Sequence, residues 1–175
     1  EVDRLSAISY NDQNQKAKEK NILITSGPAY DRLKIISNRL IAQTTVFRDD
    51  TQQWNWQLVL INAPILNATC APGGKITFYT GLIEQLNLAD DEIAAIMGHE
   101  IAHALREHGR ERLSQAMAQS AVANIAMEVA GPYGSAISAA NQAAQYVLVL
   151  PNSRQNESEA DAIGLELAAR AGYNP

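Results

Sequence analysis

Two histidines four residues apart, His99 and His103, enclose a glutamate at position 100. Residues four apart on an α-helix lie one turn apart on the same face, so both imidazoles can bind one metal ion. Glu100 would project beside that ion, where its carboxylate can take a proton from an activated water molecule. The pattern predicts a catalytic site with one zinc ion per chain. His99 and His103 are the expected ligands, and Glu100 is the expected catalytic base.

The flanking residues predict that this motif lies on a helix. Three acidic residues at 90–92 suit a helix N-terminus, where carboxylates cap the backbone and interact favourably with the helix dipole. Apolar residues then recur at helical spacing, at Ile93, Ile96, Met97, Ile101 and Leu105. We therefore expect a metal-binding helix over about residues 90–108.

A third ligand must come from elsewhere in the chain, because catalytic zinc usually has three protein ligands and one position for water. Glu157 begins an acidic segment with helical apolar spacing, in which Asp161 lies on the same face. Cys70, the single cysteine, offers a thiolate as an alternative. Residue types and spacing alone leave both choices open.

Further short motifs accompany the two histidines in order along the chain. They are Asn67-Ala68, Pro72-Gly73-Gly74, a short strand at 75–79, Gly81-Leu82, and Glu157 to Asp161 followed by Ala162-Ile163-Gly164. With these motifs the chain resembles the zinc metallopeptidase family of the CAAX prenyl endopeptidase and HtpX. It is most similar to the soluble bacterial envelope members of the LoiP, YcaL and BepA type.

The resemblance implies a metalloendopeptidase of the gluzincin type. Glu157 would be the third zinc ligand, and Asp161 would orient a ligand histidine. Glu159 is interpreted as a solvated carboxylate at a helix start, and Cys70 as a small buried hydrophobic residue. The substrate would be an extended polypeptide bound along a sheet edge. By resemblance, that edge strand consists of Lys75, Ile76, Thr77, Phe78 and Tyr79.

Composition limits the class of protein. The chain has 175 residues, 46% of them hydrophobic, which is enough for one domain with its own core. Its 14 basic and 19 acidic residues give a net charge of −5 without a basic patch, so we expect no nucleic-acid partner. No apolar run is long enough to span a membrane. One cysteine cannot form an internal disulfide.

We expect an α+β, zincin-like fold that is mostly helical. A small sheet would place its edge strand, at about 75–80, beside the metal-binding helix. Residues 1–24 are expected to form a polar, loose N-terminal arm, and residues 25–175 the catalytic domain. The patterns further predict a helix from Pro28, a strand over 54–60, a short helix at 82–86, and an alanine-rich helical pair or lid over 114–150.

The two ends of the chain carry expectations about location. The chain begins with Glu1 rather than methionine, so we expect that an export signal or lipid anchor has been removed. Relatives in the family usually continue past the position of Pro175, so we also expect a C-terminal truncation. The expected location is the bacterial periplasm or cell envelope. There the missing anchor would allow association with a membrane surface, in quality control of envelope or membrane-associated proteins.

Other readings of the same residues remain open. The domain could be a catalytically idle, chaperone-like binder stabilised by zinc, or a deformylase-like hydrolase with Cys70 as a ligand. A di-iron bundle would need a second Glu-x-x-His motif, which the sequence lacks. The donor that stabilises the reaction's oxyanion is not identified. His108 and Arg154 are the polar candidates.

Overall fold

The computed structural model describes residues 2–116, 118 and 152–175. Its helices and strands, in chain order, are α1 (Val2–Glu19), β1 (Leu23–Ile24), α2 (Pro28–Ile41), β2 (Gln57–Ile61), β3 (Ala68–Ala71), β4 (Lys75–Tyr79), α3 (Thr80–Gln85), α4 (Asp90–Leu105) and α7 (Arg154–Arg170). Two short 3-10 helices, Thr44–Val46 and Asp49–Gln53, precede β2. Residues 108–116 are also helical. The predicted helical pair or lid lies, from 119 to 150, outside the described residues.

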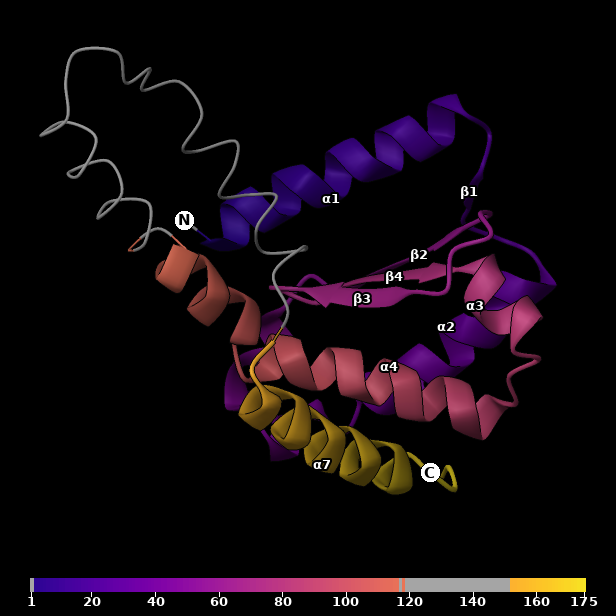
Figure 1. Cartoon of the computed structure of the whole chain (residues 1–175). Helices are drawn as coiled ribbons and strands as arrows, with labels where there is room; N and C mark the ends of the chain where they lie inside the picture. The colour runs from indigo at the N-terminus through magenta and orange to yellow at the C-terminus, as the bar shows by residue number, and fades with distance from the viewer. Residues whose placement is uncertain (1, 117, 119–151) are drawn as a thin grey trace, which may run out of the picture.

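The elements form layers around one small sheet (Figure 1). Helix α1 lies on one side of the sheet, and α2 and α4 lie on the other, with α7 packed against α4. The predicted α+β class, mostly helical with a small sheet, is confirmed. Helix α2 begins at Pro28, as predicted, because proline suits the first turn of a helix.

The sheet order corrects the predicted edge strand. The strands are arranged β1-β2-β4-β3, so β4, at 75–79, is an interior strand that pairs with β2 in parallel and with β3 in antiparallel. The glycine turn at 72–74 reverses the chain and pairs Cys70 with Ile76. Lys75 to Phe78 are accordingly buried. The edge strand packed against α4 is β3.

The N-terminal segment is a docked helix, not the loose arm that its polar composition predicts. Tyr10 and Ala17 of α1 are buried. The Tyr10 hydroxyl donates a hydrogen bond to the Ile76 carbonyl at 3.5 Å, and the Gln13 amide donates to Thr77 at 3.2 Å. A few contacts spaced along one face hold this helix on the sheet, although its sequence lacks a strong apolar stripe.

The strand predicted over 54–60 is shorter than expected and ends one residue later. Trp54 and Trp56 lie before β2, with ring centroids 5.2 Å apart. The Trp56 indole donates a hydrogen bond to the Thr51 carbonyl, which ties this ring to the preceding 3-10 helix. Gly74, with φ +80°, leaves the space that the Trp56 ring fills. The aromatic residues therefore close one end of the core instead of extending the strand.

Candidate metal centre

Helix α4 carries the His-Glu-x-x-His motif in its C-terminal half. Its first turn holds the predicted acidic residues, and the Glu92 carboxylate accepts a hydrogen bond from the Ala89 backbone N–H at 2.7 Å. Ile93, Met97 and Ile101 are fully buried and fix the rotation of the helix about its axis. This rotation places His99 and Glu100 at the half-buried border of the helix and buries His103. The motif is therefore held on a rigid, well-packed element.

Helix α7 brings the third predicted ligand to the histidines. Its first turn is capped by Ser153, whose hydroxyl accepts a hydrogen bond from the Asn156 backbone N–H. Glycines allow α4 and α7 to approach closely: a Cβ on Gly98 would lie 2.6 Å from the Gly164 carbonyl oxygen, and one on Gly164 would lie 2.6 Å from the His99 nitrogen. The close approach puts Glu157 opposite both histidines.

The ligand atoms of His99, His103 and Glu157 converge on one point. The two Nε2 atoms are 2.9 Å apart, and the Glu157 oxygens lie 3.3 Å from His99 Nε2 and 3.4 Å from His103 Nε2. Tetrahedral ligands about 2.0–2.1 Å from zinc lie about 3.3 Å from one another. Within the described residues, this is the one group of three or more potential metal-binding side chains. The donor types and spacing fit a zinc ion.

Asp161 lies behind His99, one turn after Glu157 on α7. Its carboxylate is 2.9 Å from His99 Nδ1. An imidazole that binds a metal through Nε2 carries its proton on Nδ1, and a carboxylate there accepts that proton's hydrogen bond. The structure places Asp161 where the predicted orienting role requires it.

Electrostatics at the site follow from burial. Burial and the neighbouring His99 lower the pKa of His103 to about 4, so this imidazole is neutral at pH 7, as a metal ligand must be. Burial, with the nearby Glu157 charge, raises the pKa of Glu100 to about 8. A carboxyl group whose pKa lies near the working pH can both take and return a proton.

Cys70 is not part of this group of donors. It is buried on β3, and burial raises the pKa of its thiol. Its sulfur contacts the backbone carbonyl of Ala71 at 3.8 Å. Among the described residues, the donor atoms that lie together with those of the two histidines are the Glu157 carboxylate oxygens, and the Cys70 sulfur is not among them.

Two further predictions need correction. Glu159 is not simply solvated: its carboxylate is 2.9 Å from His108 Nε2 and 2.7 Å from Arg106 Nε.

The second prediction concerns the candidates for oxyanion stabilisation. His108 is almost fully buried, and its Nδ1 lies 2.9 Å from His103 Nδ1, on the side of that ring away from the ligand atoms. It is therefore not placed to contact a reaction oxyanion. Arg154 is the exposed first residue of α7.

Residues that the sequence analysis missed lie close to the ligands. The Asn152 amide nitrogen is 3.3 Å from His103 Nε2, and the Asn152 side-chain oxygen accepts a hydrogen bond from Arg112. The positive charge of Arg112 acts on both Glu100 and Glu157. No motif could have indicated these residues, because they lie 40 positions apart and only the fold brings them together.

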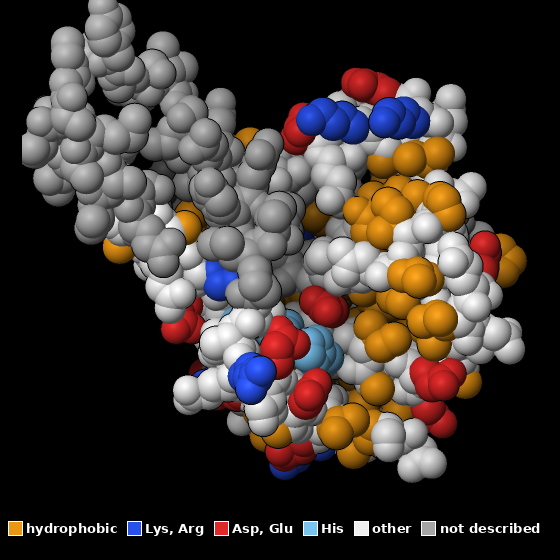
Figure 2. Space-filling model, viewed as in Figure 1, with side chains coloured by type: hydrophobic (Ala, Val, Ile, Leu, Met, Phe, Trp, Pro, Cys, Tyr) orange, Lys and Arg blue, Asp and Glu red, His pale blue; other side chains and the backbone are white. Residues whose placement is uncertain are grey.

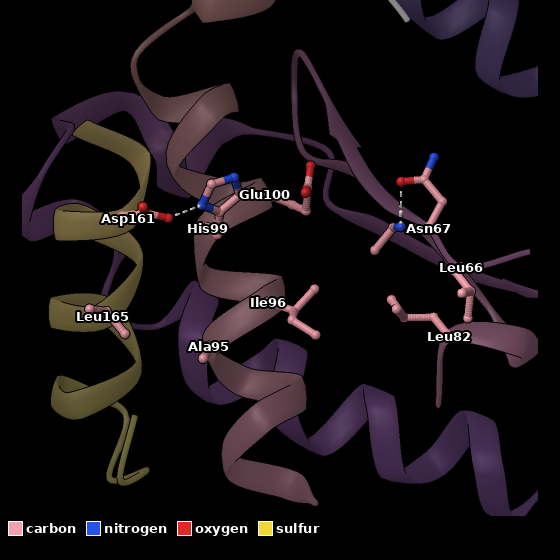
Figure 3. A pocket seen from close by; sticks show the side chains of 10 residues that line it. Leu66, Asn67, Leu82, Ala95, Ile96, His99, Glu100, Asp161 and Leu165 are labelled. Atoms are coloured by element: carbon pink, nitrogen blue, oxygen red, sulfur yellow. Dashed lines mark hydrogen bonds and ion pairs between the residues drawn. The ribbon is translucent and has the colours of Figure 1, made fainter. Parts of the chain in front are cut away.

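A largely apolar pocket of about 520 Å³ adjoins the motif (Figure 3). Figure 3 shows Leu66 and Leu82 facing Ile96 of α4 across this space, with Glu100 and His99 at one end. Its remaining lining residues are Asn67, Ala68, Ala95, Asp161 and Leu165. In Figure 2, histidine is bordered by acidic side chains, and hydrophobic side chains cover much of the neighbouring surface.

The sequence is similar to several known metalloendopeptidases and proteases. The mitochondrial metalloendopeptidase OMA1 of Arabidopsis thaliana is 36% identical over 121 residues, covering 69% of this chain and 24% of that protein. OMA1 of Saccharomyces cerevisiae is 36% identical over 122 residues, covering 69% and 34%. The beta-barrel assembly-enhancing protease of Escherichia coli is 28% identical over 123 residues, covering 66% and 25%. The chain thus spans about a quarter to a third of the length of these relatives.

The family comparison covers most of the chain. The sequence profile described as Peptidase family M48 matches residues 31–175. This range contains the motif helix, the helix of Glu157 and the whole sheet except β1. The family is one of metallopeptidases, in agreement with the resemblance that the short motifs predict. The chain belongs to peptidase family M48.

Proposed function

We propose that this chain is the catalytic domain of a zinc-dependent endopeptidase. The observation that carries the proposal is the convergence of His99, His103 and Glu157, with Glu100 next to them on the same helix turn. Three ligands of these types leave a fourth position open on a tetrahedral zinc ion, as catalytic sites require. A structural site would close that position with a fourth protein ligand.

The roles of the residues follow from their chemistry. A zinc ion bound here would act as a Lewis acid toward the scissile carbonyl and lower the pKa of water. Glu100 takes a proton from the attacking water and returns it to the leaving amine. Asp161 keeps the proton of His99 on Nδ1, so that Nε2 stays available as a ligand atom.

The surroundings of Glu100 favour an extended polypeptide as the substrate. The backbone of β3, the edge strand beside α4, can pair with an added strand. The pocket lined by Leu66, Leu82 and Ile96 then receives an apolar side chain next to the scissile bond. We infer a preference for unfolded or extended segments that carry an apolar residue at this position.

We further propose a role in quality control of membrane-associated or envelope proteins, in the bacterial periplasm. The similarity to the beta-barrel assembly-enhancing protease of Escherichia coli, which is named for the assembly of β-barrels, supports an envelope role. None of the described helices has the length and apolar character needed to cross a membrane. Cell fractionation of the full-length protein in its native host tests the location: recovery in the cytosolic fraction would contradict it.

Metal removal and restoration test the proposed activity. Purified protein should cleave an unfolded protein substrate, lose this activity on treatment with a chelator, and regain it with one equivalent of Zn²⁺. The Glu157→Gln variant should retain its fold but not regain activity at that zinc concentration. Tight binding of unfolded substrate without cleavage, in the zinc-loaded protein, would favour the idle chaperone-like alternative.

A further inference from the structure

A second series of hydrogen bonds lies behind His103, the other histidine of the proposed zinc site. His103 Nδ1 is 2.9 Å from His108 Nδ1, and His108 Nε2 is 2.9 Å from a Glu159 oxygen. His103 and His108 are both buried, with exposed fractions of 7% and 3%. Ring nitrogens at this depth need defined partners, because an unpaired buried polar atom is costly.

The positions of the proposed ligand atoms determine which ring nitrogens carry protons in this series of hydrogen bonds. Nε2 of His103 faces His99 and Glu157, so it must keep its lone pair if it is to bind a metal. The proton of His103 is then on Nδ1, which donates to Nδ1 of His108. His108 in turn carries its proton on Nε2 and donates to the Glu159 carboxylate. Each link has one donor and one acceptor.

The backbone is shaped to make this contact possible. In a continuous helix, residues five apart would be rotated by about 140° and could not meet ring to ring. Here α4 ends at Leu105, and Glu107 adopts a left-handed conformation with φ 58°. This turn brings His108 back against His103. A non-glycine residue in this conformation is uncommon and is retained only where the surroundings require it.

We propose that His108 and Glu159 are positioning residues that fix the ring orientation and the proton of His103. Asp161 does the same for His99 directly, whereas Glu159 acts through an intervening imidazole. The inference rests on the proposed zinc site, and it assigns to the Glu159 carboxylate a role beyond its ion pair with Arg106. Loss of such an outer partner typically weakens metal affinity about 10- to 100-fold.

Zinc affinity of the purified chain, measured by competition with a chromogenic chelator, tests the proposal. His108→Phe keeps a ring but removes the acceptor, and should weaken Zn²⁺ binding about 10-fold or more. His108→Gln, whose side-chain oxygen can accept from His103 Nδ1, should restore part of this loss. The visible spectrum of the Co²⁺-substituted protein should change in His108→Phe, because the ring of His103 is no longer held.

Two surface variants separate positioning from packing and charge. The Glu159 side chain is only partly buried, so the Glu159→Gln variant should fold. It should weaken Zn²⁺ binding, because it removes the charged acceptor for the proton of His108. Arg106→Gln breaks the other ion pair of Glu159 but leaves the histidine contact, so its affinity should be unchanged. Equal affinities for His108→Phe, Glu159→Gln and the parent would overturn the proposal, as would equal losses in His108→Phe and His108→Gln. Failure of the parent itself to bind Zn²⁺ would overturn the proposed function as well.

Discussion

Glu100 has to satisfy two opposing requirements. In its proposed role as general base it must lose its proton, yet it is half-buried and close to the Glu157 charge, where the ionised form is disfavoured. A bound cation would offset both effects by attracting the two carboxylates. Without the cation, the burial of Glu100 should weaken the fold at neutral pH. The functional demand on this residue is therefore measurable as a stability cost.

The metal-free protein should show this cost in its pH dependence. The folded-state pKa of Glu100, about 8, lies above its ordinary value of 4.5. The folded chain therefore binds the proton more tightly, and the contribution of Glu100 to the free energy of unfolding falls as pH rises between these values. Chemical denaturation at several pH values measures this free energy, and the Glu100→Gln variant should lack the decline. His103, with its lowered pKa, acts in the opposite direction but is common to both proteins.

Substitution of Asp161 tests whether the carboxylate behind His99 supports zinc binding. Asp161→Asn should weaken zinc affinity about 10- to 100-fold, because the charged acceptor for the His99 proton is lost. Glu166→Gln is the matched control: it removes one carboxylate from the same helix, where Glu166 pairs only with Arg170 among the ion pairs of the described residues. If both variants lost affinity equally, the effect would be general electrostatics. Glu159 is unsuitable as a control because it contacts His108.

The contact between α4 and α7 decides whether Glu157, the proposed third ligand, reaches the histidines. Gly98 and Gly164 face each other, and no side chain separates the helices at this point. The sequence motif that carries Glu157 and Asp161 ends in this same glycine. Gly164 therefore sets the distance between α4 and α7, because any Cβ here would push Glu157 away from the histidines.

Gly164→Ala should damage both stability and metal binding. The added Cβ would lie 2.6 Å from the backbone nitrogen of His99, so one helix must move. Overpacking of this kind costs about 1–3 kcal/mol in the free energy of unfolding. Thermal denaturation and zinc titration should both report the loss. Ala162→Ser, on the exposed face of α7, should change neither by a comparable amount.

The helices that carry the site were predictable, but parts of their surroundings were not. The spacing of His99 and His103 and the apolar period of α4 are local signals, and the fold retains both. The order of strands is a long-range property: β3 has only four residues, and nothing in its sequence shows that it, rather than β4, forms the edge. The contact of His108 with His103 depends on a turn at Glu107 that lacks the usual glycine. Such a turn leaves no sequence signal.

Across the whole molecule, zinc should act as a link between distant segments. His99 and His103 lie on α4 and Glu157 on α7, more than 50 positions later in the chain. A ligand that binds only the folded state raises stability according to its concentration, by about 4 kcal/mol at 1,000 times the dissociation constant. Zn²⁺ should therefore raise the melting temperature of the parent by several degrees. The same addition should have little effect on Glu157→Gln, and an equal rise in both would place the metal elsewhere.

The most direct measurement combines zinc content and proteolysis in one Glu100→Gln preparation. The amide keeps the shape of the side chain but cannot take a proton from water. We expect one zinc ion per chain, a fold unchanged by circular dichroism, and cleavage of an unfolded protein substrate at least about 100-fold slower than in the parent. Cleavage within a few-fold of the parent rate, with zinc bound, would contradict the account.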